Sequence, residues 1–395
     1  MARCSRWPSP SVSDDASRVG MGDIVNVPLL DLVAQYRAIK DEVLPALQAV
    51  IESQQFVMGP PVAELESAVA QLAHAKHGIA CASGTDALLL PLKALDLAPG
   101  DEVITTSFTF FATAGAIHNA GGTPIFVDIE PGTFNIDPAA VEAAITPRTR
   151  AIVPVHLYGQ MVVMERLLAI ARGRGVKLVE DAAQAIGARR SIDGEWRMAG
   201  ELGWATGYSF FPSKNLGAWG DGGMMVTSDD ALADRLRKLR LHGGAKQYHH
   251  DEVGTNSRLD SVQAAVLLAK LPHLAAWSNK RRAHAASYTK ALEDVSGVRT
   301  PVVDSANEPI FHQYTLRVER RDELRAHLKK HGVGNAVYYP VALHLQNCFR
   351  HLGYTRGRLP EAERAAAEVI SLPIYPELTP EQIGYVVDTI RGFYR

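Results

Sequence analysis

Lys214 is the residue whose surroundings point most clearly to chemistry. It lies in the run Tyr208-Ser-Phe-Phe-Pro-Ser-Lys-Asn-Leu-Gly-Ala-Trp-Gly-Asp-Gly-Gly223, among small, apolar and glycine residues. A lysine amine becomes a useful nucleophile when burial or nearby cations lower its pKa. The glycines let the backbone approach a flat ligand closely. The run therefore indicates covalent chemistry at Lys214, although a surface lysine in a flexible loop has the same local pattern.

Asp181 is a carboxylate in the segment Val179-Glu-Asp-Ala-Ala-Gln184, which lies at the end of an apolar predicted strand. Ligands of α/β proteins bind at the carboxyl ends of the strands. A carboxylate in that place can pair with the protonated nitrogen of a heteroaromatic cofactor and so make its ring an electron sink. The alternative is that Asp181 caps a following helix, which is the commoner use of this residue type.

Two further segments offer groups for a phosphate and for a flat ring. In Cys81-Ala-Ser-Gly84-Thr85-Asp, a strand runs into a helix, so free N–H groups and the helix dipole can bind an anion. A plain helix cap is the alternative. In Thr106-Ser-Phe-Thr-Phe110-Phe111, an aromatic ring could stack on a cofactor, although core packing explains at least two of the three phenylalanines.

A fifth segment, Thr255-Asn256-Ser-Arg258-Leu-Asp260, leads into a predicted helix. Asn256 and Arg258 can bind phosphate or carboxylate, and arginine does so with a two-pronged fork. The alternative is a capped helix start with Asp260 as the cap. No zinc-ligand spacing, phosphate-binding Walker sequence or Gly-x-Ser-x-Gly turn occurs in the chain, so we expect no metal site.

The elements that must position these residues alternate along the chain. Short apolar runs predict seven strands, and helical patterns lie between many of them, so we expect an α/β fold with a mostly parallel sheet covered on both faces. The predicted strands are 79–81, 102–105, 124–127, 151–155, 177–179, 207–210 and 223–226. The predicted helices are 41–53, 64–74, 85–95, 109–120, 138–145, 164–174, 230–240, 261–271, 277–292, 321–331 and 361–370, and a further strand spans 313–318.

Composition bounds the class of protein. The 395 residues are 47% hydrophobic and 21% charged, with a formal net charge of −2, which fits a soluble globular protein and gives no bulk attraction to nucleic acid or an anionic membrane. No apolar run approaches the roughly 20 residues that span a bilayer. The three cysteines, Cys4, Cys81 and Cys348, lack metal-ligand spacing, and we expect reduced thiols in a cytoplasmic protein.

The chain is predicted to have three parts. Residues 1–22, rich in Ser, Pro and Arg, lack the apolar core of a signal peptide and are expected to be a disordered tail, with Met21 as a possible true start. Residues 23–275 form a large domain with an N-terminal arm. Residues 276–395 form a small C-terminal α+β domain.

Taken together, these motifs resemble the DegT/StrS-type sugar-nucleotide aminotransferases, which are pyridoxal-phosphate (PLP) enzymes of fold type I. The resemblance covers over nine tenths of the chain and leaves out the first twenty residues. It is carried by Ser83-Gly-Thr-Asp-Ala87, Ser107-Phe-Thr-Phe110, Phe126-Val-Asp-Ile129, Pro154-Val-His-Leu-Tyr-Gly159, Glu180-Asp-Ala-Ala-Gln184, residues 209–223 and Asn256-Ser-Arg-Leu-Asp260. It implies a large domain with a mostly parallel seven-stranded sheet and a smaller C-terminal domain.

The resemblance also implies residue roles. Lys214 would hold PLP covalently and later carry the reacting proton. Asp181 would pair with the ring nitrogen, Gln184 would contact the hydroxyl side of the ring, and Phe110 would stack on its face. Gly84, Thr85 and Ser209 would hold the phosphate. Asn256 would complete the phosphate site from the partner subunit, which implies a homodimer with shared active sites.

The implied reaction moves an amino group from L-glutamate to a nucleotide-linked keto sugar, for amino-sugar and polysaccharide biosynthesis. The stretches 249–254 and 371–376 resemble members that act on 3-oxo sugars, including UDP-linked 2-acetamido-3-oxo sugars. Substrate contacts are expected from Arg258, His312, Tyr338 and His344, although each lone histidine has a structural alternative. Two other functions stay open: transamination of a cyclitol or other small ketone, and a catalytically silent regulatory homologue.

Overall fold

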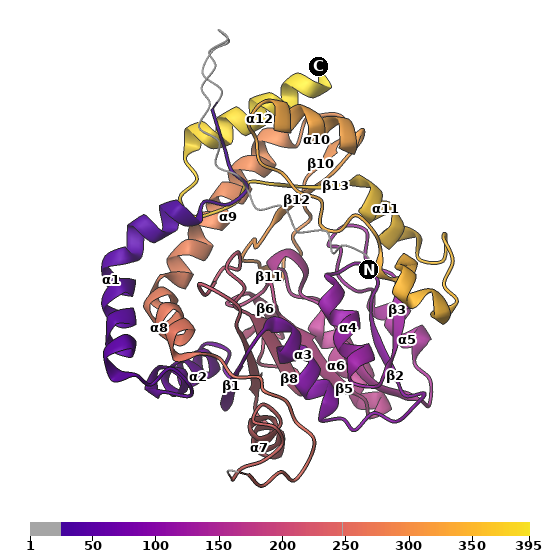
Figure 1. Ribbon diagram of the computed structural model, residues 1–395. Coiled ribbons are helices and arrows are strands. Elements are labelled where there is room, and N and C mark those ends of the chain that lie inside the picture. Colours follow the sequence, from indigo (N-terminus) through magenta and orange to yellow (C-terminus); the bar gives the residue numbers. More distant parts are fainter. Residues whose placement is uncertain (1–24, 247) are drawn as a thin grey trace, which may run out of the picture.

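The computed structural model describes residues 25–246 and 248–395, and its largest feature is a seven-stranded sheet in the order β1-β9-β8-β5-β4-β2-β3 (Figure 1). Only β9 runs antiparallel to its two neighbours. The strands are β1 His77–Cys81, β2 Glu102–Thr106, β3 Thr123–Val127, β4 Thr149–Val153, β5 Lys177–Asp181, β8 Ala205–Ser209 and β9 Gly223–Thr227. All seven predicted strands are therefore found in one mostly parallel sheet, within a few residues of their predicted bounds.

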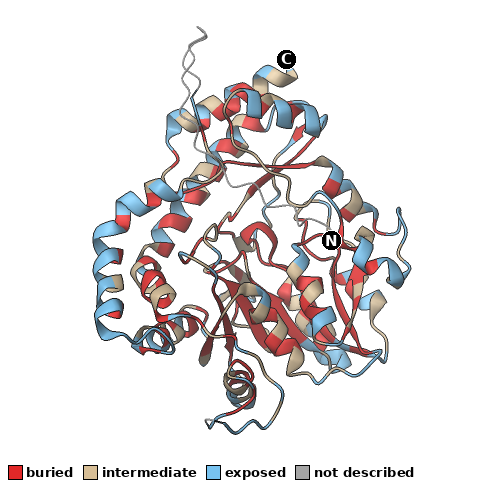
Figure 2. Ribbon diagram, viewed as in Figure 1, coloured by how far each residue is buried: buried red, intermediate tan, exposed pale blue. Residues whose placement is uncertain are grey.

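Helices cover both faces of this sheet because successive strand residues point to opposite sides. Val103, from β2, packs under α3 and α4, whereas its neighbour Ile104 packs under α2, α6 and α8. The strands are consequently buried on both faces, and Figure 2 shows the sheet as the continuous buried centre of the molecule. The helices are α1 Leu32–Ser53, α2 Pro60–Leu72, α3 Gly84–Lys93, α4 Phe111–Asn119, α5 Pro138–Ala144, α6 Met164–Arg174, α7 Asp230–Leu239, α8 Ser261–Lys270, α9 Leu274–Leu292, α10 Arg321–Lys330, α11 Pro360–Glu368 and α12 Pro380–Tyr394.

A second apolar core lies at the other end of α9. It is built by a three-stranded antiparallel sheet, β10-β12-β13, together with α9, α10 and α12. Its strands are β10 Val298–Arg299, β12 Tyr314–Val318 and β13 Val369–Leu372. Val27, near the start of the described residues, also belongs to this core, since it is buried there and exchanges backbone hydrogen bonds with Gly332 and Gly334.

The predicted division between residues 275 and 276 stays a prediction. The long helix α9 passes from one core to the other, because Leu274 belongs to the main core and Tyr288 to the second. The segment containing Leu343, Phe349 and α11 packs on the β3 side of the large sheet rather than on the second core. The predicted disordered tail lies outside the described residues.

Several predicted boundaries are wrong for identifiable reasons. Helix α1 begins at Leu32 rather than at residue 41, because Asp31 caps it by accepting a 2.8 Å hydrogen bond from the Ala34 N–H. The helix predicted to end at residue 370 gives way to β13, whose β-branched Val369 and Ile370 pair with β12. Helix α12 was not predicted, although Thr379 and Gln382 form a capping box.

A short hairpin, β6 Arg189–Ile192 and β7 Glu195–Met198, was also not predicted, and it forms a third sheet with β11 Asn307–Glu308. Its strands are only four residues long and rich in charged residues, and only β7 alternates polar and apolar residues. Its two-residue turn, Asp193-Gly194, has positive φ angles of 51° and 82° and was the sequence signal from which the hairpin could have been predicted.

Among the helices of residues 25–246 and 248–395, none combines the length and the apolar composition that crossing a membrane requires.

The joint between β9 and the start of α3 leaves no room for a side chain at Gly223. An added Cβ would lie 2.3 Å from the Ser83 carbonyl oxygen. We expect Gly223→Ala to lower the free energy of unfolding by about 1–3 kcal/mol, measured by urea denaturation. The matched control is Gly384→Ala in α12, where a Cβ meets nothing and should stabilise the helix by about 0.5–1 kcal/mol. Equal effects of the two substitutions would contradict this description of the joint.

Candidate active site

The carboxyl edge of the large sheet gathers most of the predicted cofactor-site residues. Asp181 is the last residue of β5, Ser209 is the last residue of the neighbouring strand β8, and Asp181 pairs in register with Gly207. Gly84 follows β1 at the same edge, and Lys214 lies in the connection from β8 to β9. Three segments that are distant in sequence, around residues 84, 181 and 209–214, therefore meet at one edge, where α/β proteins bind ligands.

Lys214 occupies a tight turn within that connection. Its N–H donates to the Phe211 carbonyl oxygen at 2.8 Å, and a Cβ at Gly217 would lie 2.4 Å from the Pro212 carbonyl oxygen. The side chain is only partly accessible. Burial lowers the pKa of its amine from the ordinary 10.5 to about 8, although the nearby Asp181 carboxylate acts in the opposite direction. The amine is thus a candidate nucleophile and base near neutral pH.

Asp181 is a buried carboxylate with an incomplete set of partners. One oxygen accepts a 2.7 Å hydrogen bond from the Thr113 hydroxyl, and the other accepts a 3.1 Å bond from the Ala183 N–H. Burial raises the pKa of this carboxyl group, and the hydrogen bonds and Lys214 only partly oppose that shift. No helix follows Asp181, so the helix-cap alternative is wrong. A cationic ring nitrogen would supply the charge that this site lacks, so the residues fit PLP.

The start of α3 forms a cradle for an anion. Ser83 caps the helix by accepting a 3.1 Å hydrogen bond from the Asp86 N–H. The first helical hydrogen bond joins the Ala87 N–H to the Ser83 carbonyl, which leaves the Gly84 and Thr85 N–H groups at the open end of the helix. A Cβ at Gly84 would lie 2.5 Å from the Ser209 Cβ, so the absent side chain lets Ser209 approach that end.

The three phenylalanines after β2 differ in their exposure to solvent. Phe108 is fully buried, whereas Phe110 and Phe111 are 58% and 46% exposed, so core packing accounts for one of them rather than two. Phe110 is the N-cap residue of α4, and the first turn of this helix carries Thr113 with its bond to Asp181. The Phe110 ring is therefore an open aromatic surface held on the helix that also supports the buried carboxylate.

Gln184 is held on both sides of its amide. Its oxygen accepts a 2.7 Å hydrogen bond from the Tyr158 N–H, and its amino group donates to the Tyr339 hydroxyl at 3.0 Å. The Tyr339 ring in turn lies 6.1 Å from the Phe110 ring, at an angle of 42°. Gln184 thus connects the Asp181 segment to the aromatic wall of the site.

Of the predicted substrate residues, His312 and Tyr338 lie beside the Lys214 loop. The His312 ring shares a 3.1 Å hydrogen bond with the Asn215 side chain. Burial holds the His312 pKa well below its ordinary value, and the charges of Lys214 and Arg281 add to that effect. Tyr338 lines a small cavity together with Ser213 and His312.

His344 is placed differently. It is 1% exposed, and its two ring nitrogens contact the Ser107 hydroxyl at 2.5 Å and Glu363 at 3.1 Å. Both nitrogens are therefore used to join the end of β2 to α11. This arrangement matches the structural alternative for a lone histidine and leaves no ring nitrogen for a substrate.

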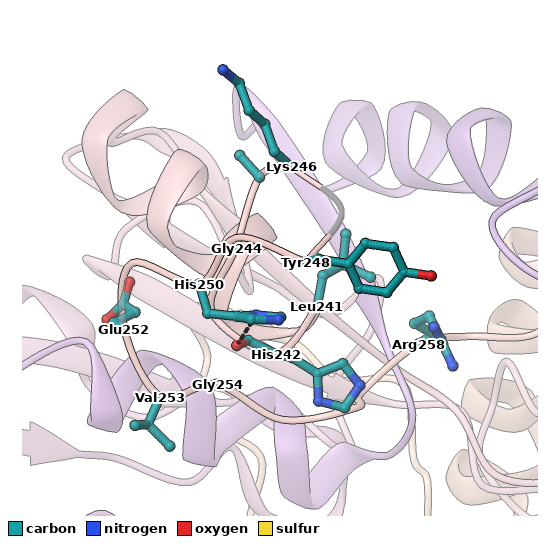
Figure 3. Close-up of a pocket in the computed structure, with 11 residues that line it drawn as sticks. Leu241, His242, Gly244, Lys246, Tyr248, His250, Glu252, Val253, Gly254 and Arg258 are labelled. Carbon is teal, nitrogen blue, oxygen red and sulfur yellow. Dashed lines mark hydrogen bonds between the residues drawn. The ribbon is translucent and has the colours of Figure 1, made fainter.

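Arg258 lines a separate surface hollow of about 720 Å³ with His242, Tyr248 and His250 (Figure 3). Lys214 is not among the residues that line this hollow. Asn256, two residues earlier, is exposed and pairs with Leu241 through a backbone bridge. Asp260 precedes α8 but makes no side-chain cap bond there.

Three residues near the site were not singled out from the sequence. Thr113 supports Asp181, Asn215 orients His312, and the charge of Arg281 lowers the pKa of that imidazole. Asn215 directly follows Lys214 and was a visible signal. Thr113 and Arg281 reach the site only through the packing of α4 and α9.

Comparison with known proteins gives one consistent family. The model of the DegT/DnrJ/EryC1/StrS aminotransferase family matches residues 37–391. The chain is 54% identical to a protein named pleiotropic regulatory protein from Geobacillus stearothermophilus, over 94% of this chain and 99% of that one. It is 45% identical to a UDP-N-acetyl-3-dehydro-alpha-D-glucosamine 3-aminotransferase from Acidithiobacillus ferrooxidans, over 92% and 97% of the two chains.

Among solved structures, DesV of S. venezuelae in complex with a ketimine intermediate superposes with a TM-score of 0.91 and 43% identity, over 94% of this chain and 99% of that one. The fold is thus that of the fold-type-I PLP aminotransferases, as the sequence motifs implied.

The opposing influences on Lys214 generate a prediction. Because the Asp181 carboxylate raises the pKa of the amine, Asp181→Asn should move that pKa further below about 8. The pH dependence of Lys214 labelling by trinitrobenzenesulfonate in PLP-free protein, followed by peptide mass spectrometry, measures the change. Asp251→Asn, which alters the surface pair with Lys238, is the matched control and should leave the Lys214 profile unchanged. A higher pKa in Asp181→Asn would contradict the proximity of the two groups.

Proposed function

Because the chain belongs to the DegT/DnrJ/EryC1/StrS aminotransferase family, whose members depend on PLP, we propose that it transfers the amino group of L-glutamate to a nucleotide-linked 3-oxo sugar. The observation that carries this proposal is the Lys214 amine, with its pKa lowered to about 8, beside the buried Asp181 carboxylate. These are the two groups that a PLP aminotransferase needs most. The products would be a 2-oxo acid and a nucleotide-linked amino sugar.

Each cofactor role is assigned to a group at the carboxyl edge of the sheet. Asp181 would pair with the ring nitrogen, Phe110 would stack on the ring, and Gln184 would contact the ring hydroxyl. Bound in this way, PLP supplies an aromatic system that withdraws electrons from the reacting carbon. The support for these roles is the buried, under-partnered carboxylate and the exposed ring on the helix that holds it. The Gly84 and Thr85 N–H groups and the Ser209 hydroxyl hold the phosphate at the start of α3.

Lys214 carries the proton in both halves of the reaction. It takes a proton from the carbon that bears the donor's amino group and delivers one to the carbon that receives the amino group. A base suits this work when its pKa lies near the operating pH, and the lowered pKa of Lys214 meets that condition. Its fixed turn keeps the amine at one edge of the site, so donor and acceptor must present their reacting carbons to the same atom.

The substrate class rests on the relatives. The A. ferrooxidans relative is named for a UDP-linked 3-dehydro amino sugar, and it aligns over nearly the whole of both chains. We extend the 3-oxo sugar class to this chain and assign substrate contacts to His312 and Tyr338, which lie beside the Lys214 loop. Such a product is a building block for amino-sugar and polysaccharide synthesis. The free thiols of Cys81 and Cys348 are compatible with the reducing cytoplasm, where we place the enzyme.

A homodimer with shared active sites is part of the proposal. Large apolar side chains remain exposed along α1 and the segment after it, which is unusual for a face that meets only water. They are Leu32, Val33, Tyr36, Leu44, Ile51, Phe56, Val57 and Met58. In such a dimer, Asn256 reaches the partner's phosphate site, and Arg258 with its hollow contributes to the partner's substrate pocket.

A regulatory role is the second candidate, because the 54% identical relative is named a pleiotropic regulatory protein. The complete set of Lys214, Asp181, Gln184 and Ser209 argues for retained chemistry, since a silent homologue has no need of a lysine with a lowered pKa. Transamination of a cyclitol or another small ketone is the closer alternative. Product analysis with nucleotide-linked and free ketones separates these two reactions.

Lys214→Ala tests the catalytic proposal. The variant should lose turnover of L-glutamate with a UDP-linked 3-oxo sugar by about 10³-fold or more, because both the covalent anchor and the proton carrier are removed. Its circular dichroism and unfolding curve should stay native. Lys270→Ala is unsuitable as a control because that amine binds the Gly217 carbonyl, whereas the surface substitution Lys238→Ala should retain the wild-type rate. Wild-type turnover by Lys214→Ala would refute the assignment.

Subunit complementation tests the shared sites. Lys214→Ala and Asn256→Ala chains are purified separately, shown to be impaired, and then mixed through mild unfolding and refolding. If Asn256 serves the partner's site, half of the dimers are hybrids with one intact site, so about a quarter of the wild-type rate should return. If each site lies within one chain, hybrid dimers contain no intact site, and mixing should restore nothing.

A further inference from the structure

A cavity of about 50 Å³ lies against the Lys214 loop and is lined on one side by Arg281. Its polar lining also includes Ser213, His312, Gln313, Tyr338 and Ser371, and leucine and isoleucine residues complete the lining. A space of this size admits a few water molecules or one small polar group. Two of the lining residues are close to Lys214. Ser213 precedes it in the chain, and the charge of Lys214, like that of Arg281, lowers the pKa of the His312 imidazole. The cavity therefore adjoins the reacting amine.

Arg281 is a buried cation that no salt bridge in the described chain neutralises. The residue is 3% exposed, and its Nη1 atom donates to the carbonyl oxygens of Ile374 at 2.7 Å and Phe311 at 3.2 Å. Its Nε atom is buried without a hydrogen-bond partner. Burial lowers its pKa to about 10, and Glu377 opposes that shift without forming a salt bridge to it. A buried guanidinium with an unused donor is costly unless an anion completes its fork.

The groups around the cavity favour an anion. Burial and the nearby charges of Lys214 and Arg281 hold the His312 pKa well below its ordinary value, so His312 adds no positive charge but can donate or accept a hydrogen bond. Gln313 has a buried side-chain oxygen without a partner, and its amide can turn to present an N–H instead. The hydroxyl groups of Ser213 and Tyr338 are further donors on the same wall. Carboxylate is the small anion that matches a planar fork flanked by such donors.

We propose that this cavity, which Arg281 lines, is a carboxylate-binding subsite for a substrate of the Lys214 reaction. The proposal rests on the proposed aminotransferase function and deepens it. The carboxylate has two possible sources, the dicarboxylic amino donor and a sugar acid carried by the nucleotide. Both enter the same site in turn, because both must reach Lys214.

Equilibrium binding to PLP-loaded protein, measured by calorimetry, tests the subsite without turnover. The probes are glutarate, which stands for the donor, and the pair UDP-glucuronate and UDP-glucose, which differ by one carboxylate. Arg281→Gln should weaken either glutarate binding or the preference for UDP-glucuronate over UDP-glucose by about tenfold or more. The first result assigns the carboxylate to the donor, and the second assigns it to the sugar. Unchanged binding of all three probes would overturn the proposal.

The neighbouring residue provides the matched control. Arg282 lies on the same helix but pairs with Glu308 and Asn279 and does not line the cavity, so Arg282→Gln should leave all three affinities unchanged. An equal loss in both variants would also overturn the proposal, because it would show a general effect of removing charge from α9.

Wild-type protein supplies a test that does not depend on folding of a variant. It should bind glutarate or UDP-glucuronate at least about tenfold more tightly than the neutral counterpart, glutaramide or UDP-glucose. Equal affinities in both pairs would overturn the subsite. The aminotransferase proposal fails separately, if wild-type protein takes up no PLP or leaves the 3-oxo sugar unchanged, and carboxylate binding at Arg281 can still be measured in that case.

Discussion

Two groups of opposite charge, the partly buried Lys214 amine and the buried Asp181 carboxylate, set the chemistry of this protein. Burial lowers the pKa of the amine to about 8 and raises the pKa of the carboxyl group, and each charge partly offsets the effect on the other. At pH 7.5, an amine with a pKa of about 8 is neutral in roughly a quarter of the molecules, against about 0.1% for an ordinary lysine. Desolvation therefore outweighs the attraction of the nearby carboxylate and keeps the amine reactive.

The scaffold holds this pair by backbone geometry more than by side-chain contacts. Asp181 is fixed by strand pairing, since its N–H donates to Pro154 at 2.8 Å and its carbonyl accepts from His156 at 3.0 Å. The preceding residue, Glu180, is fully buried and receives hydrogen bonds from His156, Gly200 and Gly203, so the strand cannot rotate. Lys214 is held by the tight turn around Gly217, which itself accepts a bond from the buried Lys270 amine. The reactive groups are thus rigid parts of the sheet edge.

Arg281 extends the same electrostatic pattern toward the substrate. His312 is buried, and the charges of Lys214 and Arg281 both lower its pKa, so two cations lie near a neutral imidazole. A buried cation without a counterion destabilises the folded protein and attracts an anion. Binding of the anion then recovers the stability that the site lost. A second core, built on β12, β13 and α9, supplies this side of the site, so substrate recognition depends on how the two cores meet along α9.

The sequence predicted the fold and the site best where a residue pattern is typical of a single structural role. Buried strands appear as continuous apolar runs, and all seven strands of the large sheet were predicted from them. The catalytic candidates Lys214 and Asp181 were visible because a lone lysine among glycines and a carboxylate after an apolar strand are unusual. The hairpin after residue 188 has charged strands, and His344 carries no local sign that both its nitrogens are occupied. Thr113 and Arg281 could not be predicted from the sequence. They lie on α4 and α9, which are distant from Lys214 in sequence, and only the packing of these helices brings them to the site.

The central claim is that Lys214 anchors PLP beside Asp181. The most direct measurement is borohydride reduction of the purified, PLP-incubated protein, followed by peptide mass spectrometry. A single added pyridoxyl phosphate on the peptide that contains Lys214, with loss of the yellow colour, is the expected result. Labelling of another lysine, or no covalent PLP at all, would contradict the claim.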